Sequence, residues 1–275
     1  MKNRFYNVSA VLLVTCLSTT SYAQRGAMQP GSPSGFKTPY QGYPGFFDTN
    51  LADHGSLVVE WPPLILPLIP MPSIAVDYGV SDTLTVGTNA LISTVPWLAG
   101  AKGISLKART LVYGTESLQS AATLYAGYLG ASEFSSSWEV FTANTAWKPA
   151  PRHVVLGQLM FMNFGAELGK ETSVDYTNIR FSTAAAGGGY QFLISDTLAV
   201  SSHALAALAT SVEADTIAQS LSADLNATSG DALWGVVRIS ADLRTETDWL
   251  VSLGGIYFHG AGGQVLPWFS ASTRW

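Results

Sequence analysis

Side-chain alternation at the C-terminus is the feature that most restricts how this chain can fold. Every second residue is mostly apolar, namely Val265, Pro267, Phe269, Ala271, Thr273 and Trp275. The residues between form a more polar set, namely Gln264, Leu266, Trp268, Ser270, Ser272 and Arg274. Successive side chains of a β-strand point to opposite faces, so the segment predicts a strand with one apolar and one more polar face.

The composition implies that the fold must keep a large apolar surface away from water. Hydrophobic residues make up 47% of the chain, and charged residues make up only 12%, about half the globular average of ~25%. Beyond the N-terminal region, no run of about 18 apolar residues is present to form a transmembrane helix. A closed barrel facing lipid pairs every backbone group between strands and needs no such run.

A strand of this pattern that ends on an aromatic residue resembles the last strand of Gram-negative bacterial outer-membrane β-barrels. The resemblance covers the chain after about residue 55, and it rests on generic features that identify no subfamily. It implies an all-β, transmembrane antiparallel barrel in contact with outer-membrane lipid and lipopolysaccharide. It also implies that the barrel-assembly machinery recognises the C-terminal strand through Phe269 and Trp275.

The first 23 residues are typical of a cleaved secretory signal peptide. Lys2 and Arg4 precede a short apolar core, and Ser21 and Ala23 supply small residues at a cleavage site. A lipoprotein signal at Cys16 is the rival interpretation, although Thr15 is bulkier than the residue that signal needs. Cys16 is the only cysteine, so cleavage after Ala23 removes disulfides, thiolate metal sites and a cysteine nucleophile from consideration.

Residues 24–55 are rich in Gly and Pro and contain several scattered aromatic residues. This composition favours an irregular periplasmic tail. A plug folded into the lumen is the alternative.

Residues 56–275 form the predicted barrel domain, in which about twelve strands are expected. The expected strands are 56–61, 73–80, 84–94, 103–113, 117–130, 135–147, 152–167, 174–194, 196–212, 231–245, 247–260 and 264–275. An even number is typical of bacterial single-chain barrels, and ten or fourteen strands stay open as alternatives.

Two Ser-Asp-Thr joins, at residues 81–83 and 195–197, predict tight turns because Ser and Asp side chains bond nearby backbone. Three further short joins are expected at residues 114–116, 148–152 and 245–248. With the last strand descending to the periplasm, all five joins fall on the periplasmic side.

Three other segments carry weaker signals. Pro62 to Pro72 contains five prolines and predicts an outer loop or a distorted strand edge. The 213–230 segment predicts either a short helix or an extended hairpin. Gly187 to Gly189 predicts a bulge or bend in the eighth strand.

The strand charges alternate with apolar neighbours and are therefore expected to face the lumen, because a charge facing midplane lipid costs about 2–4 kcal/mol for Arg or Lys. The predicted lumen-lining residues are Asp77, Lys107, Arg109, Glu139, Arg180, Arg238 and Asp242. They could line a selective constriction, or they could pair with one another and fill a narrow barrel. Most tryptophans, including Trp138 and Trp268, are expected in interfacial belts, and Trp234 and Trp268 are also predicted to face the lumen, where they could stack on a ligand.

Catalytic, metal and nucleic-acid functions have little support. His203, beside Ser201 and Ser202, is the one candidate for a Ser–His pair, but it is followed by Ala204, Leu205 and Ala206. The outer-membrane phospholipases instead carry Ser two residues after the His, and then Asn, so we expect no enzyme. No metal-binding motif or cofactor signature is present, and the acidic balance argues against a nucleic-acid partner.

The expected function is that of a passive, porin-like channel for small polar solutes. A non-conducting structural or surface-interaction barrel is the alternative, and an outer-membrane hydrolase is the third class. A soluble secreted β-sandwich is the alternative fold.

Overall fold

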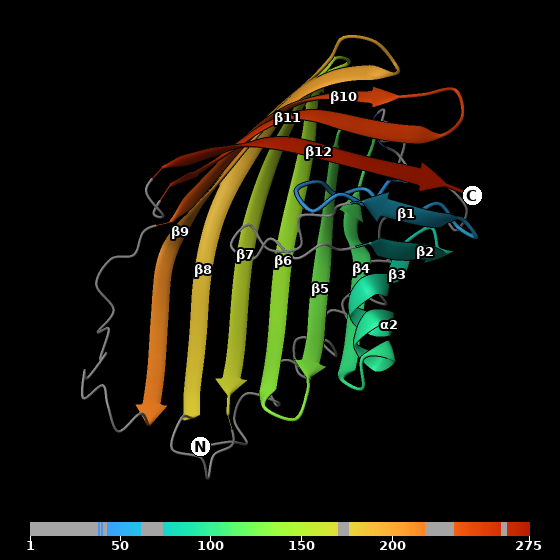
Figure 1. The fold of residues 1–275 in the computed structure, drawn as a ribbon. Coiled ribbons are helices and arrows are strands. Elements are labelled where there is room, and N and C mark those ends of the chain that lie inside the picture. The colour runs from blue at the N-terminus through green and yellow to red at the C-terminus, as the bar shows by residue number, and fades with distance from the viewer. Residues whose placement is uncertain are drawn as a thin grey trace.

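The chain folds as one closed barrel of antiparallel strands (Figure 1). The structure, a computed structural model, describes Thr38, Tyr40 and residues 43–61, 74–169, 176–217, 234–259 and 263–275. Each strand pairs with its neighbours in sequence, and β1 closes the barrel by pairing with β12. The predicted all-β class and the expected twelve strands are confirmed.

The strand bounds lie close to the predicted ones. The strands are β1 (Leu57–Trp61), β2 (Ala75–Ser81), β3 (Leu84–Asn89), β4 (Lys102–Gly114), β5 (Leu118–Gly130), β6 (Phe134–Ala150), β7 (His153–Leu168), β8 (Tyr176–Leu193), β9 (Leu198–Ile217), β10 (Gly235–Arg244), β11 (Trp249–His259) and β12 (Gln264–Arg274). The predicted Pro62–Pro72 loop and the predicted helix or hairpin beyond Ile217 lie outside the described residues.

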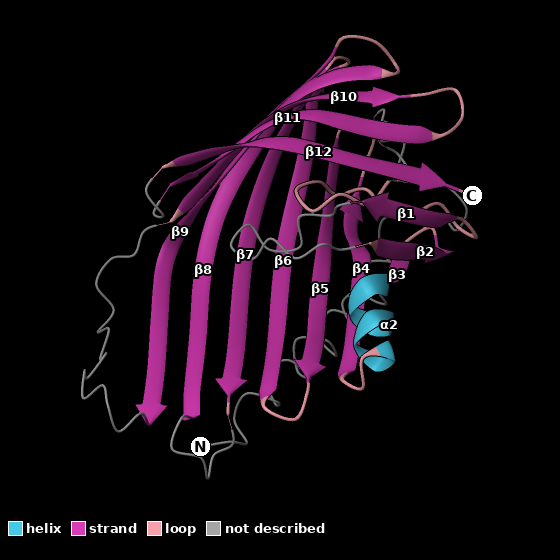
Figure 2. Ribbon diagram, in the orientation of Figure 1, coloured by secondary structure: helices cyan, strands magenta, loops and turns pink. Residues whose placement is uncertain are grey.

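The barrel wall is uneven in height. Strands β4 to β9 have 13 to 20 residues each, whereas β1 to β3 have only 5 to 7. In Figure 1, β4 to β8 stand side by side, while β10 to β12 and the short strands β1 and β2 cross them steeply. Strands dominate the described chain, and helix α2 (Ala90–Leu98) lies beside β4 (Figure 2).

The five predicted short joins connect β2 to β3, β4 to β5, β6 to β7, β8 to β9 and β10 to β11. They share one end of the barrel with the C-terminus, which we call the turn end; the opposite end is the loop end. In both Ser-Asp-Thr turns the serine hydroxyl accepts the threonine backbone N–H, with distances of 3.3 Å at Ser81 and 3.2 Å at Ser195. The repeated motif therefore closes two equivalent turns.

The outer surface carries a broad apolar band. Large aliphatic side chains on several strands are at least half exposed, namely Leu106, Leu159, Leu208, Ile239, Leu253 and Val265. Within β12, Trp268, Ser270 and Ser272 are buried, whereas Phe269 and the C-terminal Trp275 that follows the strand are exposed. The alternation predicted for the last strand thus separates an apolar outer face from a polar inner face.

A ring of aromatic residues surrounds the turn end. One such side chain, 41–69% exposed, lies near that end of β2, β4, β6, β8 and β11, and another at the C-terminus: Tyr78, Tyr113, Trp147, Tyr190, Trp249 and Trp275. Trp138 does not belong to a belt, because it is buried inside the barrel, and that part of the prediction is wrong. Trp234 and Trp268 are also buried.

The third strand is shorter than predicted. It ends at Asn89, and the residues expected to continue it form α2 instead. Asn89 caps the helix, because its side-chain oxygen accepts the backbone N–H groups of Leu91 and Ile92. The β-branched residues of this apolar segment resemble a strand in sequence, but the cap and the packing against β4 favour a helix.

Of the bulge or bend predicted at Gly187–Gly189, the bulge is absent. These glycines pair in register with β9, and the register shifts between Ala184 and Ala185 instead. The glycines allow close approach of the neighbouring strand, because a Cβ at Gly187 would lie 2.2 Å from the Ala204 carbonyl oxygen.

Helix α2 packs directly on β4 at Gly103. A Cβ there would lie 2.0 Å from the Ile92 carbonyl oxygen. We therefore expect Gly103→Ala to lower the free energy of unfolding by about 1–3 kcal/mol, as overpacking does. Urea titration of the detergent-refolded barrel measures this change. Gly157→Ala is the matched control, because a Cβ at that position meets nothing within 4 Å. Equal losses in both variants would contradict the close approach of α2.

Candidate functional site

The structure brings five of the seven predicted lumen charges together inside the barrel. Asp77, Lys107, Arg109 and Asp242 are buried, and Arg238 lines an internal cavity. Asp77 of β2 and Lys107 of β4, the two strands that flank β3, form an ion pair with Oδ2 and Nζ 2.7 Å apart. The ion pair neutralises both charges within the wall.

Glu139 and Arg180 do not face the lumen, and their predicted placement is wrong. Glu139 lies between the buried Trp138 and Val140, so its own position is on the outward face of β6. Arg180 is exposed and occupies the face of β8 opposite to Thr183 and Ala185. The prediction assumed that the apolar neighbours of a charged residue face lipid. Here the lumen is itself apolar, so the apolar neighbours of Glu139 face inward and the charge faces outward.

Residues 43–52 lie inside the barrel and residues 53–55 lie at its turn end; we call this whole segment, with Tyr40, the plug. Of the two arrangements considered for residues 24–55, a periplasmic tail or a plug in the lumen, this part of the segment takes the plug arrangement. The buried plug residues are Tyr40, Tyr43, Phe47, Thr49, Asn50, Leu51 and Ala52. The plug has no strand or helix beyond the single bridge between His54 and Gly79, so its backbone groups need other partners.

Three inward side chains, one from each of β5 to β7, supply some of those partners. Gln119 donates to the Thr49 carbonyl at 2.9 Å. Asn144 donates to the carbonyls of Phe46 and Asp48 at 3.1 and 2.8 Å, and Gln158 also donates to Phe46 at 3.1 Å. This wall of the barrel therefore binds the plug through its main chain.

Arg109 is the centre of this attachment. Its guanidinium donates to the carbonyls of Asn50, at 2.7 Å, and Gly45, and to the Thr123 hydroxyl at 2.9 Å. Its Nη1 atom also lies 3.7 Å from the Asp48 carboxylate. The side chain is only 1% exposed, so its charge depends on these plug groups for compensation.

A second attachment holds the plug at the turn end. Arg274 forms ion pairs with Asp53 of the plug and with Asp248 in the β10–β11 turn. The Tyr43 ring contacts the guanidinium groups of Arg244 and Arg274, each 5.8 Å from its centroid, and its hydroxyl donates to the Asp248 carbonyl. The hydrogen bond from Arg244 lowers the pKa of the exposed Asp248 carboxyl.

A third attachment joins the start of the plug to β10. The Tyr40 hydroxyl donates to Asp242 Oδ2 at 2.9 Å. The same carboxylate accepts the hydroxyls of Ser201 and Ser240 at 2.5 and 3.0 Å. Burial and the nearby Asp242 charge raise the pKa of Tyr40, so the tyrosine keeps its proton and remains a donor.

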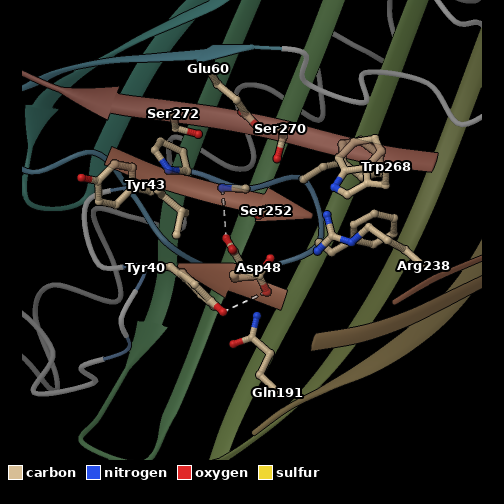
Figure 3. A pocket seen from close by; sticks show the side chains of 16 residues that line it. Tyr40, Tyr43, Asp48, Glu60, Gln191, Arg238, Ser252, Trp268, Ser270 and Ser272 are labelled. Atoms are coloured by element: carbon tan, nitrogen blue, oxygen red, sulfur yellow. Dashed lines mark hydrogen bonds between the residues drawn. The ribbon is translucent and has the colours of Figure 1, made fainter. Parts of the chain in front are cut away.

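A polar cavity of about 60 Å³ remains between the plug and the opposite wall. Figure 3 shows Glu60, Ser252, Ser270 and Ser272 on this wall, with Tyr40, Tyr43 and Asp48 of the plug nearby. The cavity has room for a few water molecules.

Arg238 lies at one side of this cavity (Figure 3). Its guanidinium carbon is 5.3 Å from the Phe47 ring centroid and 5.5 Å from that of Trp268. Its Nη2 atom is 3.1 Å from Nδ1 of His203. Two aromatic rings and an imidazole therefore hold this cation against the plug.

An apolar layer fills the lumen beyond the plug. Trp138 and Val140 in this layer lie nearer the loop end of β6 than Asn144, which binds the plug. The plug joins this layer through Phe47, and the other buried members are Ile92, Tyr125, Trp138, Val140, Met160, Met162, Ala185, Leu205, Ala207, Trp234, Val236 and Ile256. A polar solute crossing the barrel would have to pass both the plug and this layer.

The arrangement around His203 differs from a catalytic triad. The Ser201 hydroxyl donates to Asp242, and His203 contacts Arg238 and packs on the Phe47 ring with centroids 5.0 Å apart. No cluster of three His, Cys, Asp or Glu side chains in the described ranges has a geometry that could hold a metal ion. In that same part of the chain, no helix has the length and apolarity to cross a membrane.

Sequence reasoning missed the residues that bind the plug, namely Gln119, Asn144 and Gln158. They are uncharged, and a search for strand charges passes over them. Each of the three is buried between two exposed or half-buried neighbours in its strand, so each points inward. Their partners were not predictable, because the plug offers backbone carbonyls that every residue has.

Comparisons with known proteins add little. No protein-family model matches the chain, and no curated protein matches its sequence. One similar solved structure is described as "Unveiling the Mechanism Behind the in-meso Crystallization of Membrane Proteins". It is 9% identical, with 81% of this chain and 83% of that chain covered and a TM-score of 0.33, a likeness too weak to support an argument about function.

Arg109→Ala should loosen the plug. The change removes two hydrogen bonds from a charged donor to plug carbonyls, so we expect chymotrypsin to cut at Phe46 and Phe47 about tenfold faster or more. Mass spectrometry of the peptides measures the rate. Arg180→Ala, on the outward face, is the control. Unchanged cleavage in Arg109→Ala would argue that the other attachments suffice.

Plug binding should strengthen as the pH falls. Burial raises the pKa of Asp48 despite the nearby Arg109, so the bound plug takes up a proton more readily than a free plug does. The resulting stabilisation is complete below the ordinary pKa of 3.8 and is lost as the pH rises through the raised pKa. Chymotryptic cleavage at the plug, normalised to a reference peptide, should slow from neutral pH toward 3.8. Asp48→Asn should flatten this dependence, and a profile identical to wild type would contradict the assignment.

Proposed function

We propose that the protein is an outer-membrane β-barrel that is sealed in its resting state and serves a structural or surface-interaction role. The observation that carries the proposal is the plug, whose backbone carbonyls are bound by Arg109, Gln119, Asn144 and Gln158. The apolar layer beyond it adds a second barrier to polar solutes.

The outer surface supports the membrane location. The exposed aliphatic band has the polarity that a lipid-facing wall requires, and the aromatic ring at the turn end suits a membrane–water interface. Lipid and lipopolysaccharide are then the surrounding partners. The β12 strand, with Phe269 and Trp275 outward, is proposed as the segment that the assembly machinery reads.

A passive channel for small polar solutes is the second candidate. The polar cavity beside Arg238 favours it, because this is where a path along the plug would begin. Conduction would then require displacement of both the plug and the apolar layer. We propose no catalytic role, since Ser201 is engaged with Asp242 and His203 with Arg238.

Planar-bilayer recording of the purified full chain tests the sealed state. We expect no discrete conductance steps from the wild-type protein, because the plug and the apolar layer both close the lumen. Stable steps in the wild type would overturn the sealed state and favour the channel. In that case Arg238→Glu should shift the reversal potential in a salt gradient toward cation selectivity.

The location is tested separately by fractionation. The protein should appear in the outer-membrane fraction and migrate faster on gels when unheated, because an intact barrel stays compact in detergent. Recovery only in the soluble fraction would contradict the membrane proposal, whatever the conductance result.

A further inference from the structure

The polar cavity between the plug and the opposite wall lies close to the turn end. Glu60, Ser252 and Ser272 line it, and each lies near the turn-end terminus of its strand, in β1, β11 and β12 respectively. Ile256, a member of the apolar layer, lies further along β11 toward the loop end. The cavity is therefore on the turn-end side of the apolar layer.

The strand register gathers Glu60 and three serines into one part of this wall, which we call the polar patch. Glu60 pairs with Ser272 across β1 and β12. Ser270 pairs with Ser252 across β12 and β11. Ser270 and Ser272 are alternate residues of one strand, so both point to the same face. Figure 3 shows the polar patch near Asp48 of the plug.

The three serine hydroxyls of the polar patch have no hydrogen-bond partner among the described residues. Ser252, Ser270 and Ser272 are only 6–8% exposed, and all three line the cavity. Buried hydroxyls are normally bonded. Three of them that face one cavity without a partner indicate that its contents supply the missing hydrogen bonds.

Glu60 adds a charge that the surrounding protein does not pair. Asp48, Glu60 and Asp242 are the carboxylates that line the cavity. Asp48 has Arg109 3.7 Å away, and Asp242 accepts the hydroxyls of Tyr40 and two serines. In the described part of the chain, Glu60 has neither an ion pair nor a hydrogen bond. A carboxylate removed from bulk water is costly unless it is paired.

Arg238, which also lines the cavity, is engaged elsewhere. Its guanidinium lies between the rings of Phe47 and Trp268 and contacts His203. Water in the cavity could bond the serine hydroxyls, but it would bring no charge to Glu60. The polar patch therefore lacks one small cation that can also donate hydrogen bonds.

We propose that the cavity binds a small primary ammonium ion, such as ethanolammonium. Its N–H groups donate to the Glu60 carboxylate and to the hydroxyls of Ser270 and Ser272, and its charge compensates that of Glu60. Such binding needs neither a pore nor conduction, so it is independent of whether the barrel is sealed.

The size and the donor set of the cavity select this ligand. The volume is about 60 Å³. A water-sized group takes up about 15 Å³ of such space, so about four non-hydrogen atoms fit. No cluster of three His, Cys, Asp or Glu side chains in the described ranges could hold a metal ion. A primary ammonium needs only hydrogen-bond acceptors, which hydroxyl and carboxylate oxygens provide.

Titration calorimetry of the purified full chain in detergent tests the site with ethanolammonium chloride as the probe. We expect saturable binding that is about tenfold weaker or more in Glu60→Gln, because a charge-assisted hydrogen bond is lost. Glu116→Gln, in the exposed β4–β5 turn, is the matched control and should bind as the wild type does. An absence of saturable binding, or equal affinities in the wild type and Glu60→Gln, would overturn the site.

The chemistry of the probe gives a second test that needs only the wild-type protein. Tetramethylammonium carries the same charge but has no N–H donor, so it should not bind. Sodium chloride should compete with ethanolammonium no better than tetramethylammonium chloride does at the same ionic strength. Saturable tetramethylammonium binding, or stronger competition by sodium, would overturn the assignment to a primary ammonium ion.

The position of the ligand is tested through the plug. Tyr43 and Asp48 of the plug line the same cavity, so release of the plug destroys the site. Ethanolammonium at about ten times its dissociation constant should therefore slow chymotryptic cleavage at Phe46 and Phe47 about tenfold, relative to a reference peptide. The same concentration should have no effect on Glu60→Gln. Saturable binding that leaves wild-type cleavage unchanged would contradict a site beside the plug.

Discussion

Every backbone N–H and C=O group inside this barrel needs a partner, and the rest of the structure follows from where the strand ladder supplies one. Around most of the wall the ladder is complete, including the closing pair of β1 and β12. At two places it is not, namely the edge of β4 and the plug. In both, polar side chains bond the main chain instead, through Thr88, Ser93 and Trp97 at the edge and chiefly through Arg109 at the plug.

The same requirement explains how charges are accommodated in a chain that is 12% charged. Lys107 is neutralised by Asp77, and Arg109 is compensated by plug carbonyls and Asp48. Arg238 is held between two aromatic rings rather than by an ion pair. Each of these three cations is therefore stabilised in a different way, and two of them, Arg109 and Arg238, depend on contacts with the plug. The plug is thus an integral part of the barrel's electrostatics.

The strand pattern was predictable because alternation and turn chemistry are local properties. The Ser-Asp-Thr turns and the inward and outward faces of β12 follow from neighbouring residues alone. Helix α2 was not predicted, because its sequence also resembles a strand. The cap at Asn89 and the packing against β4 decide in favour of the helix, and the packing is not visible in the sequence. Glu139 was misplaced because alternation cannot tell lipid from an apolar lumen. The plug contacts join residues far apart in sequence, and no local signal encodes them.

Because the plug leads directly into β1, it constrains the order in which the molecule can form. The barrel closes only when its first and last strands meet, and the plug is joined directly to the first of these strands. The Tyr40–Asp242 contact spans 202 residues, so it forms only after nearly the whole wall is present. Contacts of such long range slow folding, because their loop entropy is lost before they contribute. Because Tyr40 can reach its partner only once β10 is in place, this attachment of the plug belongs to a late step of assembly.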